Sequence, residues 1–249
     1  MGDRSQIEQA VEGFVHGLCY CRSFTYPFWA RRVGPLWVTR DAPRKNRKYR
    51  NEEWVAFGVE PPVVDGIVRR GARGRFAICE IHPVGKPDDK MREGYKSLGY
   101  RLQTTEPLMR HSLRKIPRFA PPTGVEIERV WRQDLADRLA KVARARQILP
   151  QHFENEEVRQ YVALAGEKIV GWVRSVDAGA SRWCSNMHVL PAYRRRGIAR
   201  AMMSQMLWDD RDNGSKANVL TASHVGAKLY PVVGYEHLAT LYVYKLRRS

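Results

Sequence analysis

The sequence predicts an α/β protein in which helices flank mixed β-sheets, arranged as a tandem of two related domains. Segments with helical apolar spacing take turns with short apolar or alternating segments along the chain. Near the middle, the stretch "IPRFAPPTGV" carries three prolines and a glycine and shows neither period, which predicts a linker at residues 117–124. We therefore expect one domain at residues 1–116 and a second at residues 125–249.

The first half is predicted to contain two helices and several strands. "SQIEQAVEGFVHGLCY" and "DDKMREGYKSLGY" have apolar residues at helical spacing, which predicts helices at 5–20 and 88–100. Three segments rich in apolar residues predict strands: "PLWVTR" at 35–40, "EEWVAFGV" at 52–59 and "RFAICEIH" at 75–82.

The second half is predicted to follow the order β-α-β-β-β-α-β-α-β. Its helices show the 3.6-residue period and are expected at 132–149, 198–208 and 223–235. Ser223 is a candidate N-cap for the third helix, which Pro231 is expected to bend or end. Strands are expected at 124–130, at 158–176 as a hairpin turning at 165–168, and at 182–190, 217–222 and 237–246.

A short motif occurs once in each half. "GYKSLGYRL" and "LYPVVGYEHL" both contain a tyrosine, three residues, Gly-Tyr and then a predicted strand. The tyrosine pairs are Tyr95 with Tyr100 and Tyr230 with Tyr235. Because similar elements surround both copies, we infer a degenerate duplication.

The composition predicts a folded, cytoplasmic protein that attracts anions. The chain has 249 residues, 43% of them hydrophobic, and a formal net charge of +17. No apolar run approaches the roughly 20 residues that span a bilayer, and the start "MGDRSQIEQA" lacks a secretory pattern, so we expect no membrane partner. Basic residues are spread over both halves, so a generally basic surface explains the charge, and nucleic-acid binding is the alternative.

The cysteines do not predict a metal site. Cys19, Cys21, Cys79 and Cys184 include one C-x-C but no second pair or nearby histidine at zinc-finger spacing. We therefore expect reduced thiols and no bound metal.

The stretch "AYRRRGIARAMM" follows a predicted strand and opens a predicted helix. Helix N-termini bind phosphates, because their first N–H groups have no partner inside the helix and the helix dipole is positive there. Gly197 and Ala199 are small enough for close approach of a ligand, and Ile198 is expected to turn into the core. Four arginines can reach further phosphates: Arg194, Arg195, Arg196 and Arg200.

Arg-x-x-Gly-x-Ala between a strand and a helix resembles the pyrophosphate loop of the GNAT N-acetyltransferase superfamily. "MHVLPAYRRRGIA" is similar to the family's strand, Val-x-Pro-x-Tyr-Arg and loop, and "GAKLYPVVGY" is similar to its Ala-x-x-Leu-Tyr-x-x-x-Gly-Phe. The resemblance covers residues 125–245 in element order and implies a GNAT-like acyltransferase fold with acetyl-CoA as donor. "RRGARGR" in the first half has the composition of such a loop but no adequate helix after it, so we expect a non-catalytic GNAT-like first half.

The resemblance also implies roles for individual residues. The backbone of Met187, His188 and Val189 is expected to face the cofactor on a splayed strand, with an N–H near Met187 polarising the thioester carbonyl. Tyr230 corresponds to the tyrosine that protonates the departing sulfur in many members, a role that suits a phenol because its basicity is comparable to that of a thiolate.

His224 stands three residues before Ala227, where members often carry an asparagine that contacts the pantetheine arm. It is a candidate for that contact and, together with Ala227, for cofactor binding. It is also a candidate for the general base.

The strand before the loop supplies no evident base. Alternation puts Trp183, Ser185 and Met187 on the face that the resemblance assigns to the amine, and neither Trp183 nor Ser185 is a normal base. His188 falls on the opposite face, so we interpret it as structural. The segment "PQHFENEE" offers three carboxylates as another source of the base: Glu154, Glu156 and Glu157.

We therefore expect an acetyl-CoA-dependent N-acetyltransferase that works without a metal on an amine of a small molecule or a peptide. The alternative is a non-catalytic acyl-CoA-binding module with a basic surface for nucleic acid. A salt-dependent affinity for nucleic acid without turnover distinguishes the alternative.

Overall fold

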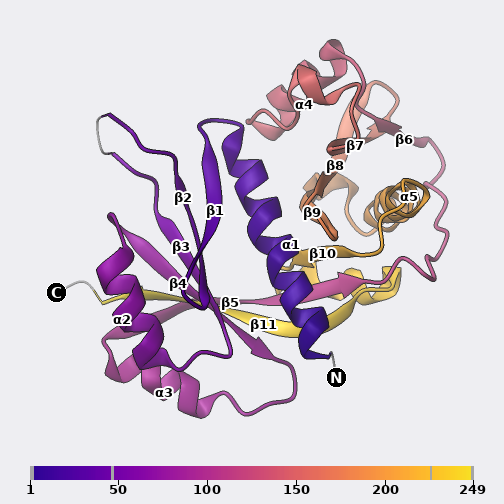
Figure 1. Ribbon diagram of the computed structural model, residues 1–249. Helices are drawn as coiled ribbons and strands as arrows, with labels where there is room; N and C mark the ends of the chain where they lie inside the picture. The colour runs from indigo at the N-terminus through magenta and orange to yellow at the C-terminus, as the bar shows by residue number, and fades with distance from the viewer. Residues whose placement is uncertain (1–2, 46–47, 225, 248–249) are drawn as a thin grey trace. The chain divides into compact units, whose positions relative to one another are not determined.

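The computed structural model describes residues 3–45, 48–224 and 226–247 (Figure 1). The chain forms two compact units, each of which combines segments that are distant in the sequence. Unit 1 comprises Met1–Met109, Thr221–His224 and His237–Ser249, and unit 2 comprises Arg110–Leu220 and Val225–Glu236.

Unit 1 contains a mixed sheet and three α-helices in its described residues. The helices are α1 (Arg4–Ser23), α2 (Pro61–Gly71) and α3 (Asp89–Ser97). The strands are β1 (Phe28–Val33), β2 (Leu36–Asp41), β3 (Glu52–Phe57), β4 (Phe76–Pro83), β5 (Tyr100–His111) and β11 (Glu236–Leu246). Hydrogen-bonded neighbours follow the order β1-β2-β3-β4-β11-β5. β3 and β4 run parallel, whereas β11 runs antiparallel to β4.

The helices of unit 1 cover both faces of its sheet. Arg22 of α1 forms an ion pair with Glu53 of β3. The next residue, Trp54, packs with Val64 and Val68 of α2 in a buried cluster. Because consecutive strand residues point to opposite faces, α1 and α2 lie on opposite sides of β3. α3 lies beside α2 (Figure 1).

Unit 2 contains the second mixed sheet. Its strands are β6 (Val125–Arg129), β7 (Val158–Ala165), β8 (Lys168–Asp177), β9 (Arg182–Val189) and β10 (Asn218–Thr221), and they pair in the order β10-β9-β8-β7-β6. β9 and β10 are parallel, and the pairs among β6 to β9 are antiparallel. Helical segments are α4 (Gln133–Ala143), η1 (Pro150–His152), η2 (Pro191–Tyr193), α5 (Ile198–Asp212), η3 (Gly226–Lys228) and η4 (Tyr230–Val233).

A buried carboxylate joins α5 to the sheet of unit 2. Asp210 is fully buried, and its Oδ1 accepts hydrogen bonds from Arg159 on β7 and from Ser175 on β8, the latter at 2.7 Å. Its Oδ2 accepts from Asn218 on β10 at 2.6 Å. The charge of Arg159 compensates the buried carboxylate, so α5 is held in a fixed position against three strands.

Most predicted elements are confirmed. The helices expected at 5–20, 88–100 and 198–208 are present as α1, α3 and α5, and the hairpin predicted to turn at 165–168 joins β7 to β8. The helix predicted at 132–149 is shorter and ends at Ala143, because Arg144 adopts a left-handed φ of 54°. β1 and α2 were not predicted, since β1 contains adjacent arginines and α2 begins with two prolines.

The prediction of an α-helix at 223–235 is wrong. The described part of this segment contains two short 3-10 helices, η3 and η4. Pro231 has no N–H to donate, and its ring clashes with the carbonyl four residues earlier in an α-helix. Ser223 is therefore not the N-cap of an α-helix in the residues that the structure describes.

The two copies of the tyrosine motif have the same local geometry. The rings of Tyr95 and Tyr100 meet edge to face with centroids 5.9 Å apart, and those of Tyr230 and Tyr235 do so at 5.6 Å. The glycine before the second tyrosine has a φ of 87° in the first copy and 99° in the second, a conformation that favours glycine. This agreement supports the inferred duplication.

The compact units do not coincide with the two contiguous domains expected from the sequence. β11 completes the sheet of unit 1, because it pairs with β4 over six residues from Ala239 to Tyr244. The predicted linker at 117–124 lies in unit 2, where Ser204 of α5 donates to the carbonyl of Pro117 at 2.7 Å and accepts from the N–H of Phe119 at 3.3 Å.

Two kinds of feature are not found in the described ranges. No helix there combines the length and the apolar character that crossing a bilayer requires. No three residues among their histidines, cysteines, aspartates and glutamates are grouped to hold a metal ion.

Candidate active site

β9 and β10 separate after a short parallel ladder. Asn218 is paired with Arg182 and Val219 with Trp183, and within the described ranges no further pair joins these strands. β9 continues to Val189. The edge of β9 beyond Trp183 therefore keeps backbone N–H and C=O groups that no strand of unit 2 pairs on this side. The splayed strand expected at Met187, His188 and Val189 is present, and its contacts to a cofactor stay a prediction.

A β-bulge interrupts β9 just before these residues. Trp172 of β8 is opposite His188 and Arg174 is opposite Ser185, so one residue of β8 faces two residues of β9. Asn186 lies in the bulge and has a φ of 58°, and its side-chain amide donates to Oε1 of Gln147. The extra residue bends β9 and reverses its side-chain alternation.

The bulge corrects the predicted orientation of His188. Nε of Arg174 donates to Oγ of Ser185 at 3.2 Å, and the ring of Trp172 stacks on His188 with centroids 4.5 Å apart. Trp172 and Arg174 are two residues apart on β8 and share a face, so Ser185 and His188 share that face too. The prediction that His188 points to the opposite face is wrong, because alternation does not hold across a bulge.

His188 is suited to accept a proton. Burial, and to a smaller extent the charge of Arg194, lower the pKa of His188. The imidazole is therefore neutral at physiological pH, and its stacking on Trp172 restricts its orientation.

The loop after β9 makes two left-handed turns before α5 begins. Arg195 has a φ of 65°, and Gly197, the N-cap of α5, has a φ of 90°. Glycine adopts this conformation at little cost, whereas other residues rarely adopt it. Ile198 is 1% exposed, which confirms that it turns into the core.

The beginning of α5 presents backbone donors. Its first intrahelical hydrogen bond runs from the N–H of Ala201 to the carbonyl of Gly197 at 3.1 Å. The N–H groups of Ile198, Ala199 and Arg200 precede that bond and have no acceptor inside the helix. The space over Gly197 is open, because an added Cβ would meet nothing closer than the guanidinium of Arg200 at 3.5 Å.

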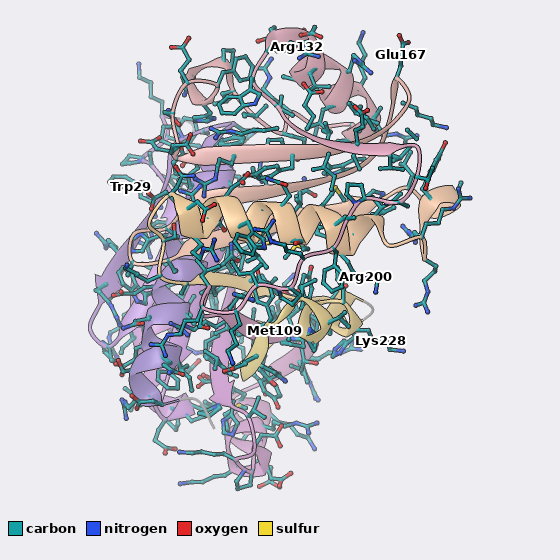
Figure 2. The ribbon with its side chains drawn as sticks, turned by 90° about the vertical axis from the view of Figure 1, so that its right-hand side faces the viewer. Trp29, Met109, Arg132, Glu167, Arg200 and Lys228 are labelled. Atoms are coloured by element: carbon teal, nitrogen blue, oxygen red, sulfur yellow. The ribbon has the colours of Figure 1, made fainter. Side chains whose placement is uncertain are left out.

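The loop arginines surround this site with exposed guanidinium groups. Nε of Arg194 donates to the carbonyl of Val189 at 2.9 Å, and Arg196 donates to that of Ala192 at 3.0 Å. Arg200 lies over the ring of Phe119 at 5.1 Å, and its side chain is labelled in Figure 2. Arg194, Arg195, Arg196 and Arg200 are all exposed, so their charges are available to an anion.

Tyr230 is buried at the start of η4. It is 7% exposed, and its carbonyl accepts from the N–H of Tyr235 at 3.0 Å. Burial, with a smaller contribution from Cys184 on β9, raises the pKa of Tyr230. The phenol therefore keeps its proton at physiological pH, which is the state that a proton donor needs.

His224 and Ala227 fall in different units. Ala227 is a half-buried residue of η3 in unit 2, whereas His224 belongs to unit 1, where Nε2 is 3.0 Å from Oγ1 of Thr105. The structure thus groups Tyr230 and Ala227 with the arginine loop in unit 2 and places His224 outside that unit. Both roles expected of His224 stay predictions.

The acidic segment before β7 offers a poor base. Glu156 accepts hydrogen bonds from Arg129 at 2.8 Å and from Arg159 at 2.7 Å. Partial burial opposes ionisation, but these arginines hold the pKa of Glu156 below its usual value. Glu154 and Glu157 are exposed. Glu156 is therefore a structural ion-pair partner.

Sequence reasoning missed three contributors to the site. Asn186 makes the bulge, Gln147 binds its side chain, and Phe119 packs under Arg200. The only signal was the asparagine itself, a residue that tolerates the left-handed region, and that signal fits turns equally well.

Comparison with known families identifies the segment that carries this site. Residues 156–237 match the family model described as an acetyltransferase (GNAT) domain. The match spans β7 to η4 and includes the splayed strands, the arginine loop and Tyr230. Among curated proteins, none matches the chain significantly.

Solved structures with the same fold cover nearly the whole chain. A GCN5-related N-acetyltransferase from Kribbella flavida has a TM-score of 0.66 at 14% identity, over 95% of this chain and 97% of its own. A GCN5-related N-acetyltransferase from Sphaerobacter thermophilus has a TM-score of 0.57 at 15% identity, over 85% and 78%. A tandem GNAT protein from the clavulanic acid biosynthesis pathway has a TM-score of 0.56 at 9% identity, over 99% and 97%.

At these identities the structural likeness establishes the fold, and the family model matches residues 156–237. The predicted mixed α/β fold of the GNAT type is confirmed, and the tandem match agrees with a two-part chain. The segment at residues 156–237, which contains the splayed strands and the arginine-glycine loop, is thus the part of the chain that matches the acetyltransferase (GNAT) domain.

Proposed function

We propose that the chain is an acetyl-CoA-dependent N-acetyltransferase that transfers the acetyl group directly to an amine of a small molecule or a peptide. One observation carries the proposal: within unit 2, the unpaired edge of β9 leads directly into a loop and a helix start that present backbone donors. This is a site for a ligand that has both a peptide-like arm and phosphates.

The residues of unit 2 fit the parts of acetyl-CoA. The N–H groups of Ile198 and Ala199 are available to the pyrophosphate, and the helix dipole favours its charge. The loop arginines extend this positive region: Arg194, Arg195, Arg196 and Arg200. The open backbone edge at 187–189 can pair with the amides of the pantetheine arm as a further strand would.

Proton transfer is assigned to two kinds of group. Acetyl-CoA supplies the acyl group as a thioester. Oη of Tyr230 gives its proton to the departing sulfur, a role supported by its burial and its protonated state. His224 and His188 are the candidates for the group that takes the proton of the amine. His188 shares the Ser185 face, and its neutral imidazole can accept a proton.

The decisive experiment is calorimetric titration of acetyl-CoA and of CoA into the full chain and into Gly197→Glu. The substitution strains a left-handed position and puts a carboxylate among the phosphate donors. We expect affinity to fall by about a hundredfold or more. Gly166→Glu is the matched control, because Gly166 is also left-handed, with a φ of 57°, and lies in open space at the β7–β8 turn.

Turnover is measured on a panel of small amines and peptides with the same proteins. In the panel, His224→Ala loses acetyl-CoA affinity if His224 contacts the pantetheine arm and loses kcat if it is the base. No binding of acetyl-CoA to the wild-type chain contradicts the proposal. Binding without turnover on any amine favours a non-catalytic acyl-CoA-binding module instead.

A further inference from the structure

Unit 1 contains a cavity that the proposed acetyl transfer does not use. Its volume is about 420 Å³, and its walls come from the start of α1, the connection between β3 and α2, the end of β4, the start of α3 and Leu238 of β11. All of these residues belong to unit 1. A volume of this size is within the range of small-molecule sites.

Two polar residues of β4, Glu80 and His82, are among those that line this cavity. Glu80 is 3% exposed, and its Oε2 accepts a hydrogen bond from Oη of Tyr95 at 2.7 Å. His82 lies two residues further along the same strand and therefore on the same face. Its Nε2 is buried and has no hydrogen-bond partner among the residues that the structure describes. A buried polar atom without a partner leaves a hydrogen bond that a ligand in the cavity can make.

The chemistry of these two groups specifies a ligand that donates hydrogen bonds. The single proton of Tyr95 is already given to Glu80, so Tyr95 adds no second donor. An ionised Glu80 only accepts, and a neutral His82 accepts at Nε2 in one of its tautomers. An ammonium group carries three donors and a charge that pairs with the carboxylate.

The other residues that line the cavity determine which groups the ligand can carry besides its ammonium. Met91 of α3 and Leu238 of β11 are apolar lining residues on the same side of the sheet as Glu80. The mouth carries exposed charges, among them Arg4, Lys86, Lys90 and Glu60, and basic groups predominate. A second ammonium at the mouth would meet this positive charge.

We propose that this cavity binds a small primary monoamine, with its ammonium group on Glu80 and His82 and its apolar chain along Met91 and Leu238. The site lies wholly in unit 1 and does not require acetyl-CoA. The positive mouth selects monoamines over diamines and polyamines.

The pH dependence of this binding follows from the state of Glu80. Burial raises the pKa of Glu80 to about 8, the hydrogen bond from Tyr95 opposes this rise, and Glu60 adds to it. Below that pH the free protein holds a proton on Glu80, which an ammonium ligand must displace. Amine affinity is therefore expected to rise between about pH 6.5 and 8.5, with release of close to one proton per amine near neutral pH.

Several charged or titratable groups face Glu80 from the surrounding elements. They are Tyr95 of α3, Tyr242 and Tyr244 of β11, His82 of β4 and Glu60 before α2, and the cavity lining adds Lys90 of α3, Lys86 before it and Arg4 of α1. The free protein has a raised pKa at Glu80, so its contribution to stability is present at low pH and is lost as the pH rises toward 8. A bound ammonium reverses that loss.

Calorimetry on the full chain tests the proposal with n-pentylamine, 1,5-diaminopentane and pentan-1-ol in buffers of different ionisation enthalpy. We expect n-pentylamine to bind, and the diamine and the alcohol to bind at least about tenfold more weakly. Glu80→Gln keeps the size and the acceptor for Tyr95 and is expected to weaken n-pentylamine binding about tenfold or more and to abolish proton release.

Two controls keep this result distinct from the acetyl-CoA site. Glu53→Gln removes another buried glutamate of unit 1, on the opposite face of the sheet, and is expected to leave amine binding unchanged. Gly197→Glu is expected to leave it unchanged as well, whether or not acetyl-CoA binds. The proposal is overturned if n-pentylamine does not bind at millimolar concentration, if pentan-1-ol binds equally well, or if Glu80→Gln binds it with parental affinity.

Discussion

The same strand–helix–strand arrangement occurs in both units, but only one copy is open. In unit 1, β3 and β4 are paired without interruption from Glu52 opposite Phe76 to Phe57 opposite Ile81. In unit 2, the corresponding strands β9 and β10 share two pairs and then separate. A bulge accompanies the opening in β9. The closed ladder leaves no backbone edge for a ligand, whereas the open one does.

The helices that follow β3 and β9 also differ, because α2 lacks free backbone donors at its start and α5 has them. α2 begins with Pro61 and Pro62 behind an N-cap glutamate, Glu60, so two of its first N–H donors are absent and the residue before them carries a negative charge. α5 begins behind Gly197 with residues that keep their N–H groups. A few residues at the strand end and the helix start thus leave backbone donors open in unit 2 and remove them in unit 1.

The largest expected effect concerns the buried acids of the two units. Asp210→Asn removes the charge that compensates Arg159 in unit 2, and we expect it to cost about 3 to 5 kcal/mol of unfolding free energy. Glu52→Gln removes the charge that compensates Arg40 and Arg73 in unit 1, and we expect a similar loss of unfolding free energy. Hydrogen exchange measured by segment should show protection lost in unit 2 for the first variant and in unit 1 for the second. Equal loss in both units would mean that they open together.

The second largest expected effect is a difference in kcat between variants of the tyrosines in the two copies of the repeated motif. Tyr230→Phe is expected to lower kcat about a hundredfold while acetyl-CoA affinity stays within about twofold, because only the proton donor is lost. Tyr100→Phe, from the copy in unit 1, should leave kcat unchanged. Since burial raises the pKa of Tyr230, the wild-type kcat should not fall between about pH 8 and 10 through loss of this proton. An unchanged kcat in Tyr230→Phe would remove Tyr230 from the mechanism.

The smallest effect makes α5 more like α2. Ala199→Pro places a proline at the second helical position, where α2 has Pro62, and removes one N–H without disturbing the helix interior. We expect acetyl-CoA to bind about tenfold more weakly with little change in melting temperature. The matched control is Ala201→Gly, two residues further on, which keeps its N–H and the hydrogen bond from that N–H to the carbonyl of Gly197. Parental affinity in Ala199→Pro would mean that the phosphates are held by the arginines alone.

Local patterns predicted the elements and the loop, but not the geometry between strands. The spacing around Gly197 predicted a helix start with open donors, and the structure confirms its conformation. The bulge at Asn186 was not predictable, because one extra residue changes no periodicity that a short strand can reveal. The position of His188 was wrong for that reason alone.

Strand pairings between segments that are distant in the chain could not be predicted from the sequence either. The sequence of β11 predicts an ordinary amphipathic strand, but its residues do not indicate that it pairs with β4. The failure at 223–235 has a local cause, since the helical period was present but Pro231 and Gly234 prevented an α-helix.

The placement of β11 constrains the order in which the chain can fold. Tyr242 of β11 donates a hydrogen bond to Asp88, which precedes it by 154 residues and is therefore translated first. While the ribosome is still adding the intervening segment, β4 and β5 have no strand between them and expose their edges. Unit 1 therefore finishes folding only after unit 2 has been translated, and nascent chains stalled before β11 should depend on chaperones.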